Sequence, residues 1–163
     1  MARDSPYKRY QTGDKTAMTD EQLRGMRLFK DEGCDICHSG PLFSDYQLHV
    51  LSVPDDSSLA SSDSGAFETP SLRNVGLTAP YMQNRVFQTL NQVLKFYDDI
   101  GGPISQNPHV TASQLDAKIQ LIALREPEQA QLIAFLHALS DPSYDRTIVA
   151  RIPSGLKPGG NIR

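Results

Sequence analysis

The string Cys34–His38 (CDICH) constrains this chain more than any other part of its sequence. It holds the only two cysteines among the 163 residues, three positions apart and followed directly by a histidine. A C-x-x-C redox disulfide normally begins a helix after a β-strand, and the residues before Cys34 predict no strand. A structural zinc site needs four nitrogen or sulfur ligands. The remaining histidines do not have the spacing of such a site: His49, His109 and His137.

Covalent attachment of a haem accounts for every residue of the motif. Thioether bonds to Cys34 and Cys37 place the adjacent imidazole of His38 under the iron as its proximal ligand. We therefore expect one haem c. The attachment chemistry takes place on the outer side of the bacterial inner membrane, so the expected location is the periplasm.

Composition excludes several other classes of protein. The net charge is −3, and Lys and Arg are not clustered as a nucleic-acid or anionic-membrane surface requires. No apolar run approaches the ~20 residues that span a bilayer. The N-terminus does not lead into a hydrophobic signal stretch. An exported protein is then expected to have lost its signal already, or the chain to be part of something longer.

Capping boxes and apolar periodicity predict the helices. One capping box, Thr19–Gln22, begins a helix that ends near Gly33, and a second, Thr89–Gln92, begins a helix that ends before Gly101. Pro127 suits the first turn of a last helix that runs to about Ser140. Residues 111–124 are expected to form another short helix.

Residues 39–86 are expected to be mostly loop, because prolines and glycines interrupt every periodic pattern. Such long loops fit a domain whose centre is filled by a large cofactor. The expected fold class is all-α, a cytochrome c-like helical domain with long loops wrapped around one covalently bound haem c. Residues 1–18 are interpreted as an extended lead-in, 19–140 as the haem domain and 141–163 as an extended tail rich in Pro and Gly.

Several separated stretches resemble one known family. They are GCDICHSGP (33–41), FETPSLRNVGLTAPYM (67–82), TLNQVLKFYDDIGG (89–102) and IAFLHALSD (133–141). In this order they resemble the bacterial dihaem cytochrome c peroxidases, including the MauG branch, and specifically the C-terminal half of that family. The lead-in resembles the segment that joins the two haem domains. The resemblance implies a low-spin relay haem and the absence from this sequence of the half with the peroxide-reactive haem.

The second axial ligand of the iron has more than one candidate. The resemblance places it on the helix after the TAPY motif, where the peroxidases have Met, the MauG branch has Tyr, and this chain has Tyr97. The alternative role of Tyr97 is a buried tyrosine with a satisfied hydroxyl. Local chemistry alone favours Met82, since thioether ligands are common in electron-transfer cytochromes. Met82 could instead fill space beside the ring, and an open or His-ligated iron is the remaining alternative.

Three further residues are site candidates. Arg73 could pair with a haem propionate, because guanidinium matches carboxylate geometry, or could be an ordinary surface arginine. The resemblance also implies a calcium ion near the junction of the two domains, with oxygens from Thr78 and Pro80 and a last protein ligand from the absent half. His49 could make a hydrogen bond behind the haem ligands or be a structural loop histidine.

The chain has no Trp, whereas the resemblance implies that MauG-type enzymes pass oxidising equivalents through tryptophans. Tyrosines would have to replace them here, with Tyr46, Tyr81 and Tyr144 as candidates.

The expected function is a c-type haem electron-transfer domain that works with a redox partner protein or a second haem domain. The alternatives are a stand-alone monohaem electron carrier, or an open-site haem with its own peroxide or small-ligand chemistry. The last lacks a convincing distal acid or base.

Overall fold

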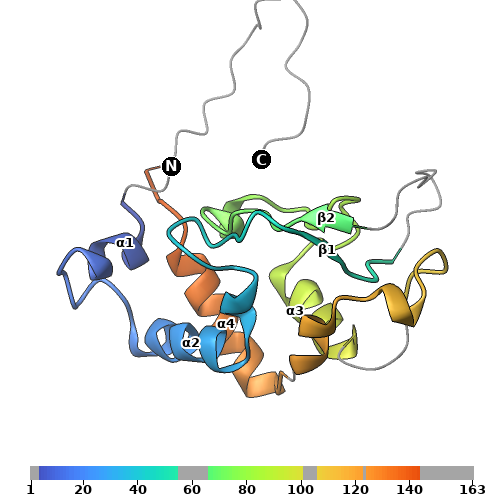
Figure 1. The fold of residues 1–163 in the computed structure, drawn as a ribbon. Helices are drawn as coiled ribbons and strands as arrows, with labels where there is room; N and C mark the ends of the chain where they lie inside the picture. Colours follow the sequence, from blue (N-terminus) through green and yellow to red (C-terminus); the bar gives the residue numbers. More distant parts are fainter. Residues whose placement is uncertain (1–3, 55–65, 101–105, 123, 144–163) are drawn as a thin grey trace, which may run out of the picture.

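The computed structural model describes residues 4–54, 66–100, 106–122 and 124–143 (Figure 1). Most of the expected C-terminal tail, and Tyr144 with it, lies outside these residues. The fold is helix-rich with one small sheet. Its helices are α1 (Pro6–Gln11), α2 (Asp20–Asp31), α3 (Leu90–Ile100) and α4 (Glu126–Ala138); its 3₁₀ helices are η1 (Cys34–Ile36), η2 (Val75–Leu77), η3 (Ala112–Gln114) and η4 (Ala117–Leu121); its strands are β1 (Leu48–Val50) and β2 (Ala66–Glu68).

The helix limits predicted from capping boxes are confirmed. The Thr19 backbone N–H donates to Gln22 Oε1 at 3.0 Å, and the Gln22 N–H donates to Thr19 Oγ1 at 3.2 Å. Thr89 and Gln92 repeat the arrangement before α3, at 3.1 and 3.2 Å. These bonds satisfy N–H groups that have no partner inside the helix, which fixes where each helix begins.

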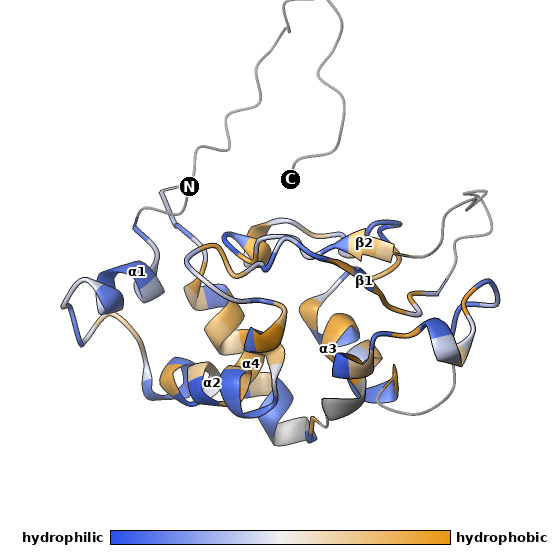
Figure 2. Ribbon diagram, in the orientation of Figure 1, coloured by the Kyte–Doolittle hydropathy of each residue, from blue (hydrophilic) through white to orange (hydrophobic). Residues whose placement is uncertain are grey.

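Apolar side chains form two separate clusters, and in Figure 2 the most apolar segments include α3 and α4. The first cluster joins α2 and α4 and includes the N-terminal half of α3; its larger members are Phe29, Phe43, Leu94, Leu132 and Phe135. The second cluster consists of Val53, Phe96, Ile100 and Ile119 and lies around the C-terminal half of α3 and η4. A domain of this size usually has one contiguous core.

Two elements differ from the sequence-based expectation. The lead-in is not extended throughout, because residues 6–11 form α1 with Ser5 as its N-cap, whose Oγ accepts from the Lys8 N–H at 3.2 Å. Tyr7 then packs its ring edge-on against Phe43 and Phe135, with centroids 5.2 and 5.8 Å apart. The segment that was expected as a short helix over 111–124 is instead two 3₁₀ helices, η3 and η4.

A third difference is the sheet, which the all-α expectation did not include. β1 and β2 pair antiparallel, with His49 opposite Phe67. Each strand has only three residues, which is too short for an alternating pattern to show in the sequence. No helix within the described part of the chain is long and apolar enough to cross a membrane.

Candidate functional site

Cys34 begins η1, shortly after the end of α2, and Cys37 is the residue directly after η1. Gly33 adopts φ +73°, the left-handed conformation that glycine permits, and this turns the chain out of α2 into η1. Both thiols are free and half-buried. Burial, together with the charges of Glu32 and Asp35, raises the pKa of Cys34 to about 12, and burial raises the pKa of Cys37. The motif therefore presents two neutral thiols from one turn.

His38 is oriented by the loop that follows it. Its Nδ1–H donates to the Phe43 carbonyl at 3.0 Å, and Phe43 itself has φ +56°. Because Nδ1 carries the hydrogen, the ligating lone pair lies on Nε2. Burial lowers the pKa of His38, which favours the neutral imidazole that binds metals. The ring lies 6.4 Å from that of Phe29, a member of the first cluster.

Tyr97 and Met82, the two candidates for the opposite axial position, both pack against the second cluster. Burial raises the pKa of the Tyr97 hydroxyl. Met82 is half-buried in a loop and has φ +66°.

Arg73 binds a loop carbonyl and two aromatic faces. Its Nε and Nη2 donate to the Pro41 carbonyl at 3.0 and 2.7 Å. Its guanidinium carbon lies 5.2 Å from the ring centre of Tyr7 and 5.1 Å from that of Phe43. Nη1 is buried and has no hydrogen-bond partner among the described residues. Nη1 is thus available to donate to a carboxylate, and a haem propionate is such a carboxylate.

The calcium and tyrosine candidates differ in their exposure. Thr78 and Pro80 are exposed in the loop after η2, and the Thr78 hydroxyl donates to the Val75 carbonyl at 3.1 Å. Tyr46 is 57% exposed, and Tyr81 packs half-buried against the first cluster.

The sequence analysis missed a cluster around His49. His49 Nδ1 lies 2.6 Å from Asp116 Oδ2, and Nε2 lies 2.9 Å from Asp45 Oδ2. Burial alone would lower the pKa of His49, but the two hydrogen-bonded carboxylates raise it. Burial alone would raise the pKa of Asp45, but hydrogen bonds from Gln47, Thr69 and His49 lower it to about 2. No local pattern pairs Asp116 with a histidine 67 positions earlier.

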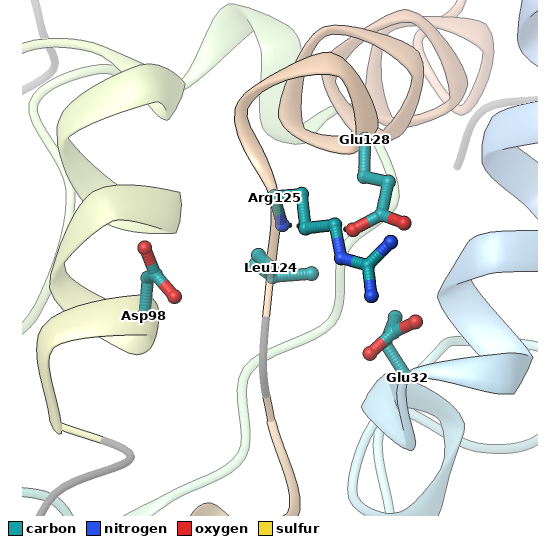
Figure 3. A pocket seen from close by; sticks show the side chains of 5 residues that line it. All are labelled: Glu32, Asp98, Leu124, Arg125 and Glu128. Atoms are coloured by element: carbon teal, nitrogen blue, oxygen red, sulfur yellow. Dashed lines mark hydrogen bonds between the residues drawn. The ribbon is translucent and has the colours of Figure 1, made fainter.

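A cavity of about 430 Å³ lies elsewhere, between the end of α2, α3 and the start of α4. Figure 3 shows the Arg125 side chain extending between the carboxylates of Glu128 and Glu32, with Asp98 across the opening. The Arg125 backbone N–H donates to Glu128 at 2.8 Å. None of the residues predicted to bind haem lines this cavity, so it is distinct from the motif's site.

Comparison with known proteins finds relatives of this chain among the bacterial cytochrome c peroxidases and MauG. No family model matches it. Cytochrome-c peroxidase IdrP1 of Denitromonas iodatirespirans is 34% identical over 83% of this chain and 44% of its own length. Methylamine utilization protein MauG of Methylophilus methylotrophus is 28% identical over 83% of this chain and 41% of its own.

Two solved structures share the fold. One is a MauG-like protein associated with microbial copper homeostasis, with a TM-score of 0.70, 29% identity, and coverage of 86% of this chain and 52% of that chain. The other is the diheme peroxidase BthA from Burkholderia thailandensis, whose TM-score of 0.65 at 20% identity shows the fold alone. The chain belongs to the bacterial dihaem cytochrome c peroxidase and MauG family. It spans less than half the length of the curated relatives named here.

The donor set fits the haem c that these relatives imply. Two free thiols lie on one turn, and a neutral imidazole held through Nδ1 follows them directly. The unpartnered Nη1 of Arg73 adds a donor suited to a propionate.

Proposed function

We propose that this chain is a c-type haem domain that transfers electrons. Cys34 and Cys37 would hold the haem through thioether bonds, and His38 Nε2 would be the proximal ligand. The proposal includes one haem for each chain, in the periplasm. When bound, the haem supplies reversible one-electron chemistry; the protein supplies the ligands, their orientation and the apolar surroundings.

The observation that carries the proposal is the division of the apolar side chains into two clusters. Cys34 packs against the first cluster, and the His38 ring lies beside Phe29 of that cluster. Tyr97 and Met82 pack against the second. This arrangement is expected if a flat haem stands between the two clusters. The proximal residues would then pack on one cluster and the candidate distal residues on the other.

Tyr97 is our choice for the distal ligand. Tyr97 packs against the second cluster whereas Cys34 packs against the first, which supports a position facing the haem from the other side. A buried tyrosine resists ionisation, but the positive charge of ferric iron favours the phenolate. A phenolate is a hard anionic donor that stabilises ferric iron, so it would lower the reduction potential. Met82 beside it remains the alternative ligand.

The partner of the domain is proposed from its family. The chain resembles the C-terminal half of the dihaem proteins, so a second haem domain or a separate redox protein would exchange electrons with it. Ile36, between the two cysteines, is 42% exposed, which supports access of a partner to this edge of the motif. Calcium at Thr78 and Pro80 belongs to the proposal only together with a second domain that completes the site.

The test is the ferric EPR spectrum of the haem-loaded protein at neutral pH. We expect a low-spin signal, because His38 and Tyr97 would fill both axial positions. Tyr97→Phe removes the phenolate oxygen and should convert the signal to mainly high-spin. The matched control, Tyr81→Phe, removes a hydroxyl from a half-buried tyrosine on the other cluster and should leave the signal unchanged.

Two results would contradict these assignments. A wild-type spectrum that is mainly high-spin would mean an open iron, and peroxide turnover would then be the next measurement. A Tyr97→Phe spectrum identical to wild type would exclude Tyr97 and direct attention to Met82. Haem attachment is checked separately, since replacing Cys34 and Cys37 by Ser should abolish covalent haem.

A further inference from the structure

Three side chains near the haem motif converge on one point. The Sγ of Cys37, a carboxylate oxygen of Asp45 and a ring nitrogen of His49 all lie within 4.8 Å of one another. They come from the motif, from the segment after it and from β1. His49 is only 8% exposed, so this is not a chance gathering of surface carboxylates.

Asp116 holds His49 in the orientation that a metal ligand needs. Its Oδ2 lies 2.6 Å from Nδ1, and its Oδ1 accepts from the Lys118 backbone N–H at 2.9 Å. With the Nδ1–H donated to Asp116, Nε2 faces Asp45 2.9 Å away and becomes a metal-binding nitrogen when the proton it shares with Asp45 leaves. A histidine whose second nitrogen donates to a carboxylate is the usual arrangement behind a zinc ligand.

We propose that the chain without haem binds a zinc-type divalent cation through Cys37 Sγ, the Asp45 carboxylate and His49 Nε2. Tetrahedral zinc, with bonds of about 2.0–2.3 Å, needs ligand atoms roughly 3.3–3.6 Å apart. The Asp45–His49 separation is 2.9 Å and the other separations are no more than 4.8 Å, so modest side-chain movements would bring the three atoms to that spacing. Water would complete the shell. The thiol proton of Cys37 and the proton between His49 and Asp45 leave to solvent as the metal binds.

This site and the proposed haem site exclude each other because both need the sulfur of Cys37. A thioether has no ionisable thiol and is a far weaker zinc ligand than a thiolate. Metal binding would therefore compete with haem attachment and end once the thioether forms. Lys118 Nζ, 4.0 Å from Asp45 Oδ2, opposes a bound cation, so Lys118→Gln should raise the affinity.

The experiment uses the full 163-residue chain, produced without haem, with Co²⁺ as a spectroscopic probe and Zn²⁺ as competitor. We expect one ion for each chain, an intense thiolate-to-cobalt absorption band, and loss of the band in Cys37→Ser and His49→Gln. Asp116→Asn should weaken binding about 10- to 100-fold, as loss of such a partner does elsewhere. The matched control is Cys34→Ser, which removes the other motif cysteine, outside this group, and should retain binding.

Binding by the motif alone, as an unstructured peptide, gives the opposite pattern. It would depend on Cys34 and His38 and be insensitive to His49 and Asp116, and that result would overturn the proposal. No cobalt–thiolate band in the haem-free chain would also overturn it. A band of equal strength in the haem-loaded protein would overturn the exclusivity. None of these outcomes bears on haem attachment, which is measured independently by covalent haem content.

Discussion

Arg73 shows how one residue joins parts of the chain that the sequence separates. Sequence reasoning offered it as a propionate partner or a surface arginine, and the structure shows its guanidinium next to the rings of Tyr7 and Phe43 while two of its nitrogens donate to the Pro41 carbonyl. That residue 73 is an arginine was sufficient to predict that it donates hydrogen bonds to an oxygen acceptor. The actual acceptor was not predictable, because Pro41 lies 32 positions earlier on a loop.

Arg73→Lys keeps the positive charge but removes the planar guanidinium group. Lysine cannot donate two parallel hydrogen bonds to one carbonyl or stack as a plane on aromatic rings. We expect the free energy of unfolding to fall by about 1.5–3 kcal/mol, the typical contribution of a hydrogen bond that involves a charged group. Urea denaturation of the haem-loaded protein measures it. The control is Arg24→Lys on the exposed side of α2, which should change little, and equal effects at the two positions would contradict the role of Arg73.

At the scale of elements, local signals predicted the helices well and long-range contacts explain what they missed. Thr19 and Thr89 are capping residues whose partners lie three positions away, so α2 and α3 could be located from the sequence. α1 is different, because its Tyr7 packs on Phe135, far along the chain. The Asp45–His49–Asp116 cluster was missed for the same reason, since β1 and η4 meet only in the folded protein.

The crossing of α2 and α4 depends on Gly25. A Cβ at this position would overlap the Gln131 carbonyl and lie 2.9 Å from the Phe135 Cβ. Glycine to alanine in a helix normally stabilises by about 1 kcal/mol, but here the two helices must move apart. We expect Gly25→Ala to lower the free energy of unfolding by about 1–3 kcal/mol, the usual cost of overpacking. Thermal and urea unfolding measure it, beside Arg24→Ala as a helical control, and a Gly25→Ala protein as stable as wild type would refute the close packing.

For the whole molecule, the consequence of two apolar clusters is a dependence on the cofactor proposed between them. α2 and α4 contact each other directly through the first cluster. The C-terminal half of α3 packs instead on Val53 and Ile119, which come from loop and η4. An element supported by few helical neighbours opens at lower free energy than a helix pair. We therefore expect that loss of haem lowers the free energy of local opening more in the C-terminal half of α3 than in α2 and α4.

Amide hydrogen exchange tests this expectation on the haem-loaded protein and on the chain with Cys34 and Cys37 replaced by Ser. Both samples contain a chelator that removes free divalent metal ions. Without haem, the amides near Phe96 and Ile100 should lose far more protection than those of α2 and α4, because Tyr97 would lose its proposed bond to iron and the second cluster would lose its proposed contact with the haem. The Ser replacements alone cannot produce that pattern, since Cys34 lies on η1 beside α2 and Cys37 directly follows η1. Protection lost equally throughout would mean one cooperative core, and the two clusters would then not be held together by the cofactor.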